Sequence, residues 1–407
     1  MSYPEPATVF PTRGFTRFWW GEAVSSFGSY VTLLALQTLV VLTLNGGAQE
    51  VGWLNAARWL PYLMVGLVVG ALVDRHRRRP VMVATDLARS AILVSIPVAW
   101  AAGALSLPLL LVIVACYGTA SLINDAASMS FLPRLVPREH LQRAHSRIDG
   151  ADAVAQTAGP ALAGLLVKLV GAPLAVLIDA ASYLFSAFAV ATLSVHERPA
   201  DATRMPNLRR EIGDGIAWVY RASGLATLAI ATHIWFAANA ILSAVVVPYA
   251  LITLGLSPVQ LGIITALGGL GGLIGATTTT AGGRRLGTGG AIITAHAVTT
   301  AGVGLMVLAG LGTDGWAAAA ILGSGQACHG FGIGFSNSHE MSYRQALTPD
   351  ELQARTNTTM RSFNRAVFVI VAPLGGLLAD HAGMRPTLVI AAIIFAAATL
   401  LLAASPF

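Results

Sequence analysis

The chain has 407 residues, of which 55% are hydrophobic and only 11% charged, whereas an ordinary globular domain carries about 25% charged residues. So few charges cannot cover the surface of a soluble protein of this size. Secreted disulfide frameworks, disordered chains and nucleic-acid-binding domains are therefore excluded as descriptions of the whole chain. Most of the protein is expected to face lipid, and we expect no cleavable signal peptide.

Apolar segments long enough to cross a membrane recur along the whole chain, each having the roughly 20 residues that a spanning helix needs. In chain order, the twelve segments cover residues 15–44, 50–73, 80–102, 105–130, 146–170, 173–195, 222–253, 258–282, 288–311, 316–340, 355–379 and 386–404. The longer connections fall at residues 131–145, 196–221 and 341–354. The sequence therefore predicts an all-α membrane protein with twelve transmembrane helices.

The basic residues predict the orientation of these helices. If the N-terminus is cytoplasmic, nineteen of the 25 basic residues fall on the cytoplasmic side, and only Lys168 and Arg385 fall on the other side. Cytoplasmic loops of membrane proteins carry such an excess of arginine and lysine. We therefore expect a multi-pass protein of the inner or plasma membrane with both termini in the cytoplasm.

The two halves of the chain resemble each other. LVPREHLQ at residues 135–142 aligns with LTPDELQ at residues 347–353, and Gly159-Pro160 aligns with Ala372-Pro373 at a similar offset. Because six spans is an even number, the halves are parallel repeats, related by a pseudo-twofold axis along the membrane normal. The sequence predicts an N-terminal six-helix bundle at residues 1–195, a cytoplasmic linker at 196–221 and a C-terminal six-helix bundle at 222–407.

The connection between the second and third spans carries a recognisable motif. Residues 70–79 read GALVDRHRRR, which resembles the G-x-x-x-D-R-x-G-R-R/K signature of the major facilitator superfamily, with arginine in place of the second glycine. The resemblance implies two bundles that rock about a central cavity and a cytoplasmic latch, which Asp125 joins as the acidic partner of the signature arginine. The latch residues are Gly70, Asp74, Arg75, Arg77, Arg78 and Asp125.

A second motif lies in the fifth span. Gly159, Pro160 and Gly164 resemble the G-P-x-x-G-G motif of antiporters in that superfamily, with Ala163 replacing one glycine. Together with residues 133–164, this motif resembles the twelve-span branch that exports drugs, macrolides and siderophores. The equivalent loop of the second half contains Arg284 and Arg285 but no acidic residue, so the latch chemistry is expected in the first half only.

Carboxylates inside apolar spans are costly and usually face a cavity or a partner. Glu22 lies about 10 Å along the first span at 1.5 Å per residue, and it is our first proton-binding candidate. Asp149 and Asp152 share one face of the fifth span and are further candidates. The alternative for Glu22 is a structural acid that is hydrogen-bonded to Ser25 or Ser26.

Other polar residues within the spans are candidates for the substrate cavity: Gln37, Arg58, Gln156, Asp179, Asn239, Arg361, Asn364 and Arg365. We expect Asp152 and Arg361 to pair in a cytoplasmic gate or, alternatively, in a lasting structural ion pair. Arg58 and Asp179 could pair with each other or contact substrate, but we favour the alternative that both are structural. His233, His296 and His329 stand alone in apolar spans, which favours hydrogen-bonded core residues.

The leading functional hypothesis is proton-coupled efflux of a small amphipathic compound, such as a drug, antibiotic or siderophore, by alternating access. The alternatives are a lipid or lysolipid flippase on the same fold and a non-transporting membrane sensor. The sequence contains no Walker loop, metal-ligand cluster or nucleophile–base set, so we expect no enzyme, no metal and no cofactor. The expected partners are a small-molecule substrate, protons and the lipid bilayer, with no nucleic acid, and we expect a monomer.

Overall fold

The computed structural model describes residues 10–73, 75–195, 208–222 and 224–405, and this part of the chain is helical and contains no strand. The first bundle contains α1 (Arg13–Leu42), α2 (Ala48–Val73), α3 (Arg78–Ala101), α4 (Leu107–Leu135), the 3-10 turn η1 (Arg138–His140), α5 (Leu141–Val170), α6 (Ala172–Ala175) and α7 (Leu177–Ala191). The second part contains α8 (Leu208–Ala217), the π-helical turns η2 (Trp218–Ala222) and η3 (Tyr249–Thr253), α9 (Ala226–Pro248), α10 (Pro258–Leu308), α11 (Gly315–Leu347), α12 (Asp350–Ala382) and α13 (Met384–Ala403).

The prediction of twelve membrane passes is confirmed. Nine helices in the described ranges are long and apolar enough to cross a membrane. One of them, α10, contains two predicted spans that meet at Gly287, where φ is +70° and only glycine fits easily. The 26-residue α2 and the 33-residue α11 supply the other two passes.

Several helices are longer than their apolar segments. α4 continues to Leu135 and α5 begins at Leu141, so most of the expected loop at residues 131–145 is helical. Most of the expected loop at residues 341–354 is likewise helical, because α11 runs to Leu347 and α12 begins at Asp350. Apolar length marks only the part of a helix that lies in hydrocarbon, and these helices extend past it.

All of these extensions lie at one end of the molecule, which we call the arginine-rich end. Its arginines include Arg13, Arg77, Arg78, Arg79, Arg134, Arg138, Arg284, Arg285 and Arg344. The opposite end, which we call the far end, holds the short connections between α1 and α2 and between α12 and α13.

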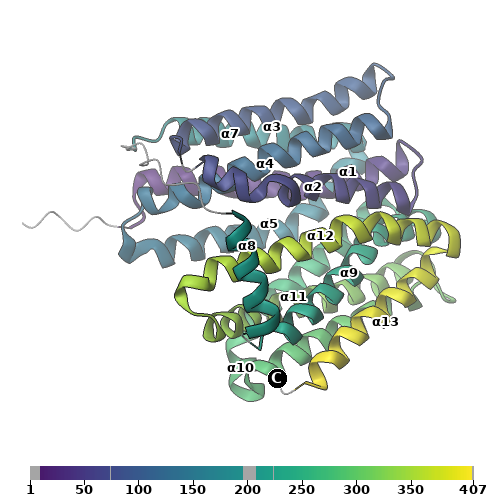
Figure 1. Ribbon diagram of the computed structural model, residues 1–407. Helices are drawn as coiled ribbons and strands as arrows, with labels where there is room; N and C mark the ends of the chain where they lie inside the picture. Colours follow the sequence, from purple (N-terminus) through teal and green to yellow (C-terminus); the bar gives the residue numbers. More distant parts are fainter. Residues whose placement is uncertain (1–9, 74, 196–207, 223, 406–407) are drawn as a thin grey trace, which may run out of the picture.

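The two bundles lie side by side, with α1–α7 in the upper part of Figure 1 and α9–α13 in the lower part. They meet along two pairs of helices, α2 with α12 and α5 with α10. By the repeat, α2 corresponds to the first half of α10 and α5 corresponds to α12. A pseudo-twofold axis between the bundles therefore exchanges the two pairs.

Glycines let the bundles touch backbone to backbone toward the far end. A Cβ added to Gly164 of α5 would lie 2.3 Å from the Pro258 carbonyl oxygen of α10, and one added to Gly376 of α12 would lie 2.2 Å from the Ala48 carbonyl oxygen of α2. Such contacts leave no space for side chains. They close the passage between the bundles at the far end.

A carboxylate reinforces this closure. Asp380 of α12 accepts hydrogen bonds from the backbone N–H groups of Ala48 (3.2 Å) and Gln49 (3.1 Å) in the first turn of α2. Free N–H groups and the positive end of the helix dipole favour an anion at this position. The acid that caps α2 thus comes from the opposite bundle.

The segment predicted as a linker contains regular structure. Residues 196–207 lie outside the described residues, but α8 and η2 follow and pack against α12 (Figure 1). Arg355 donates a hydrogen bond of 2.9 Å to Asp214, and a Cβ on Gly215 would lie 2.3 Å from the Thr359 hydroxyl. The later part of the predicted linker is therefore attached to the second bundle.

Candidate functional site

A cavity of about 660 Å³ lies inside the first bundle. Its lining residues come mainly from the parts of α1, α4 and α5 nearest the arginine-rich end. The charged side chains that line it are four carboxylates and two guanidinium groups: Glu22, Asp125, Asp149, Asp152, Arg58 and Arg89. The wall is therefore acidic overall, although arginines dominate the adjoining end of the protein.

Glu22 lies on this wall and is partly buried. The Ser128 hydroxyl of α4 donates a hydrogen bond of 3.2 Å to Glu22 Oε1. Ser25 and Ser26, the alternative partners suggested by the sequence, line the same cavity. Glu22 thus faces the cavity and makes one described hydrogen bond.

Asp152 is tied to α1 rather than to the second bundle. The Tyr30 hydroxyl donates a hydrogen bond of 3.2 Å to Asp152 Oδ2, and Asp149 lies exposed one turn earlier on α5. The expected pairing of Asp152 with Arg361 does not occur among the described residues, and Arg361 is exposed on α12. The reason is geometric: α5 packs against α10, whereas α12 packs against α2.

Arg365 contacts α2 instead. Its guanidinium carbon lies 4.9 Å from the ring centroid of Tyr62 and 5.9 Å from that of Trp59, distances typical of a cation–π contact. The Tyr62 hydroxyl donates a 2.7 Å hydrogen bond to Asp125, so α12, α2 and α4 are linked in the arginine-rich half.

Arg58 and Asp179 do not form an ion pair in the described part of the chain. Asp179 of α7 is fully buried, beside Gly28 of α1, and accepts a 2.9 Å hydrogen bond from Ser182. Arg58 lines the cavity, with its guanidinium carbon 5.9 Å from the Trp59 ring centroid. The two side chains therefore differ in position: Asp179 is enclosed and Arg58 borders open space.

The sequence reasoning missed a buried polar network in the first bundle. Asp86 and Arg89 of α3 form a salt bridge, both almost completely buried. The Arg89 guanidinium carbon lies 4.0 Å from the ring centroid of Tyr183. The Tyr183 hydroxyl in turn lies 2.6 Å from the Tyr117 hydroxyl. An acid and a base three residues apart in an apolar span could have pointed to the pair, since such residues share a helix face.

A second, smaller chamber of about 260 Å³ lies between the bundles. The structure brings three of the predicted cavity residues together here: Gln37 of α1, Gln156 of α5 and Asn239 of α9. Gln326 and His329 of α11 join them, and they were not predicted as cavity residues. The chamber carries no charged side chain.

The predicted core histidines fall into two groups. His233 contacts the Tyr220 hydroxyl at 2.5 Å and Asn364 Oδ1 at 2.6 Å, so Asn364 is buried beside a histidine rather than facing either cavity. His296 lies 3.5 Å from Glu340. His329, by contrast, lines the chamber and has no described hydrogen bond.

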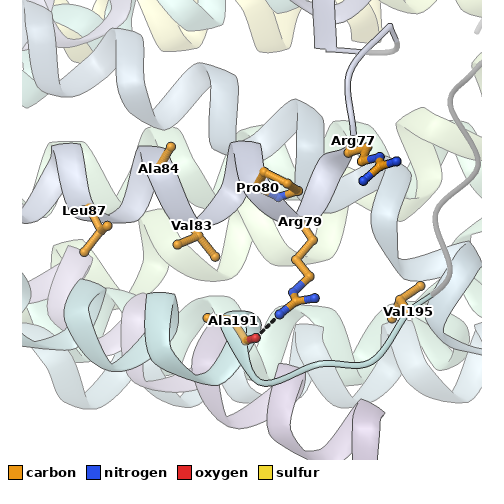
Figure 2. A pocket seen from close by; sticks show the side chains of 8 residues that line it. All are labelled: Arg77, Arg79, Pro80, Val83, Ala84, Leu87, Ala191 and Val195. Carbon is orange, nitrogen blue, oxygen red and sulfur yellow. Dashed lines mark hydrogen bonds between the residues drawn. The ribbon is translucent and has the colours of Figure 1, made fainter.

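The predicted latch is described only in part, because Asp74 lies outside the described residues. After Asp74 in the chain, Arg75 and Arg77 are exposed. Arg78 is buried, and its guanidinium group donates a hydrogen bond of 3.0 Å to the His76 carbonyl oxygen. Figure 2 shows Arg79 reaching from the start of α3 to the end of α7, where it donates to the Ala191 carbonyl oxygen. Arg79 thus joins α3 to α7 at the arginine-rich end.

The antiporter-like motif residues have packing roles. A Cβ on Gly159 would lie 2.7 Å from Tyr30 Cβ of α1, while Gly164 contacts α10 as described above. Pro160 lines the chamber between the bundles. The motif therefore lies between α1, α10 and the chamber, where close helix approach determines how the bundles meet.

The sequence matches the family model described as Major Facilitator Superfamily over residues 18–371. It is 27% identical to Macrolide efflux protein A of Streptococcus pyogenes over 225 residues, which are 53% of each chain. It is 30% identical to the multidrug efflux pump Tap of Mycobacterium tuberculosis over 264 residues, which are 62% of each chain. These matches cover less than two thirds of either relative.

Solved structures share the fold at lower identity. A bacterial homologue of the iron transporter ferroportin in its inward-facing state has a TM-score of 0.72 at 16% identity, with 95% of this chain and 98% of that chain covered. An outward-facing structure of a bacterial ferroportin homologue has a TM-score of 0.62 at 19% identity, covering 96% and 99%. Both structures thus share the fold of this chain.

Proposed function

Because this chain belongs to the Major Facilitator Superfamily, we propose that it is a secondary active transporter that exports a small amphipathic compound in exchange for protons, by alternating access. The observation that carries the proposal is the acidic cavity of about 660 Å³ in the arginine-rich half, combined with the glycine contacts that close the far end. A cavity in the arginine-rich half and closed contacts between the bundles at the far end are what one half of an alternating-access cycle requires.

The distribution of basic residues supports a cytoplasmic arginine-rich end. On this assignment both termini are cytoplasmic, the cavity faces inward, and the protein lies in the cell membrane as a monomer. An inward-facing acidic cavity can collect a compound from the cytoplasm before the bundles rock. The two efflux relatives agree with this direction of transport.

The lining indicates the chemical class of the compound. Four carboxylates and two guanidinium groups line the cavity, so a cationic group would be favoured there by the net negative charge. The adjoining chamber has apolar walls that include Leu34, Leu242 and Val246. An amine-bearing amphipathic molecule, such as a macrolide, therefore fits better than a sugar or an anion.

Glu22 is the residue that we assign to proton coupling, with Asp149 and Asp152 in support. Substrate and proton would compete for the carboxylates: substrate binds the ionised form, and protonation at the other membrane face releases it. In this scheme Glu22→Gln removes a proton site but leaves most of the cavity intact.

The test uses purified protein in proteoliposomes loaded with erythromycin. We expect Glu22→Gln to lose uptake driven by an imposed proton gradient by more than tenfold and to retain exchange of labelled for unlabelled compound at equilibrium. Glu139→Gln is the control, since Glu139 is an exposed carboxylate on η1. Equal gradient-driven uptake by wild type and Glu22→Gln would refute the role of Glu22, and net accumulation by the wild type without a proton gradient would refute proton coupling.

The flippase alternative is tested with the same vesicles. Movement of a fluorescent lysolipid between leaflets, in protein that transports no soluble cation, would replace efflux with lipid flipping as the function. Absence of both activities in folded protein would favour the sensor alternative.

A further inference from the structure

A groove lies on the outer face of the first bundle, between the start of α3 and the end of α7 (Figure 2). Its volume is about 560 Å³. Both helices pack mainly against helices of the first bundle, and they lie on the side away from the second bundle (Figure 1). The groove shares no lining residue with the acidic cavity or with the chamber between the bundles. It is therefore a separate site on the surface that meets lipid.

One part of the groove is apolar. Val83, Ala84 and Leu87 of α3 line it, and Leu87 is 49% exposed. Exposed residues on the same face of α3 run from Pro80 to Val98, a length of about 27 Å at 1.5 Å per residue. The hydrocarbon core of a bilayer is about 30 Å thick. The groove therefore lies where the lipid-facing side of α3 begins, at one edge of the hydrocarbon.

The other part of the groove is basic. Arg77 and Arg79 line it, and no carboxylate does so among the described residues. Figure 2 shows Arg79 lying against the end of α7, where its guanidinium group donates hydrogen bonds to the carbonyl oxygens of Val190 (3.3 Å) and Ala191. These acceptors hold the Arg79 side chain in one place beside the groove. Arg77 is exposed at the edge.

Arg77 departs from the superfamily signature in a way that adds charge at this point. It occupies the position at which the signature has its second glycine. Arg77 is also the N-cap of α3, and the first turn of that helix contains no acidic residue. The positive end of the helix dipole therefore adds to the charge of the two arginines. An anionic group is favoured at this end of the groove.

We propose that the groove binds one anionic phospholipid of the inner leaflet. Guanidinium groups bind phosphate oxygens through paired hydrogen bonds, so the phosphate lies at Arg77 and Arg79, and an acyl chain lies along Leu87. The cytoplasmic leaflet is the one that carries anionic lipids, and the arginine-rich end is the end assigned to it. The site needs this orientation of the protein, but neither efflux nor proton coupling.

Native mass spectrometry of the full chain in detergent measures the affinity for two probes, phosphatidylglycerol and the zwitterionic phosphatidylcholine. We expect one phosphatidylglycerol to bind about tenfold more tightly than phosphatidylcholine. Arg77→Gln should weaken phosphatidylglycerol binding about fivefold, the contribution of one basic residue at an anionic membrane surface. An unchanged melting temperature checks that the variant is folded. Arg285→Gln is the matched control, because Arg285 is exposed at the equivalent place in the second bundle and outside the groove.

Ala84→Trp tests the apolar part of the groove. Ala84 is exposed there, so an indole ring would fill the space of the acyl chain without disturbing the bundle interior. We expect phosphatidylglycerol binding to weaken about tenfold, as for the loss of two or so buried methylene groups. Ala91→Trp should bind like the wild type, because Ala91 is exposed two turns further along α3 and outside the groove.

Three results would overturn the lipid site. The first is an equal loss of phosphatidylglycerol binding in Arg77→Gln and Arg285→Gln, which would mean attraction by overall charge. The second is unchanged binding in Ala84→Trp. The third is displacement of the lipid by glycerol 3-phosphate at equal concentration, which would indicate a site for free phosphate. Each of these results leaves the efflux proposal standing, since that proposal is tested by transport.

Discussion

The two bundles share one fold but use it differently. The third span of the first bundle contains the buried Asp86–Arg89 pair, whereas the equivalent segment, residues 288–311, contains no aspartate, glutamate, lysine or arginine. The second bundle is instead locked by glycines: a Cβ on Gly330 of α11 would lie 1.9 Å from the Gly268 carbonyl oxygen of α10.

The contacts between the bundles, however, persist in both repeats. Gly164 and Gly376 lie in the aligned motifs of α5 and α12, and each touches the backbone of the opposite bundle. Charge has thus diverged between the repeats, while the backbone contacts at their interface have been retained. The first bundle therefore relies in part on a buried ion pair for its packing, and the second on close backbone contact.

The largest loss of stability is expected at the buried Asp86–Arg89 ion pair, which the second bundle lacks at the equivalent segment. Asp86→Ala should destabilise the protein by about 3–5 kcal/mol, because it leaves Arg89 charged and unpaired in the bundle interior. The apparent melting temperature in detergent should fall accordingly. The double variant Asp86→Ala/Arg89→Met should recover most of the loss. If the double variant is no more stable than Asp86→Ala, the pair is not what holds this part of the bundle.

The second bundle should be most sensitive to added volume. Gly330→Ala should destabilise the protein by about 1–3 kcal/mol, since α10 and α11 must separate to admit the methyl group. Gly304→Ala is the control, because no atom lies within 4 Å of a Cβ at that position. Its melting temperature should be unchanged or slightly higher, as alanine favours helix over glycine. Equal losses in both variants would contradict the glycine lock.

At the interface between the bundles, Asp380→Asn should weaken the cap on α2. A cap contributes about 1 kcal/mol, so the ratio of far-end-open to far-end-closed molecules should rise about fivefold. Spin labels at Leu42 and His381, one on each bundle, would report this as a larger fraction of long distances. Asp314→Asn serves as the comparison, because Asp314 makes no side-chain cap on α11. An unchanged distance distribution would mean that the cap does not bias the two states.

The smallest effect is expected at the Arg355–Asp214 pair, whose side chains are 35% and 42% exposed. Exposed pairs contribute about 0.2–1 kcal/mol, so Asp214→Asn should lower the melting temperature by a degree or two at most. A loss as large as that of Asp86→Ala would place the docking of α8 among the main stabilising contacts.

The sequence predicted the twelve passes and the family because apolar length and the motif at residues 70–79 are local signals. It did not predict the helix ends, since the extensions at Leu135, Leu141 and Leu347 are polar segments outside hydrocarbon. The sequence around Gly287 also looked like an ordinary loop between two spans, whereas in the structure α10 is interrupted only at that residue.

The sequence predicted several of the polar residues that line the internal spaces, but not which side chains contact each other. Gln37, Gln156 and Asn239 meet in the chamber because polar residues in spans tend to face the interior. Asp152 and Arg361 remain apart because the contacts of each helix are set by the pseudo-twofold arrangement, which spacing along one helix does not report. Tyr117 and Tyr183 carried no sequence signal, since aromatic residues in apolar spans are common.

The glycine contacts at the far end have a kinetic consequence. Interlocked side chains must change rotamer before two surfaces can part, but Gly164 and Gly376 present bare backbone to the opposite bundle. Two such surfaces can separate and come together again without any side chain being repacked. The rate at which this end opens should then depend on the capping hydrogen bonds of Asp380 and on the entry of water into the gap, and little on the rearrangement of side chains.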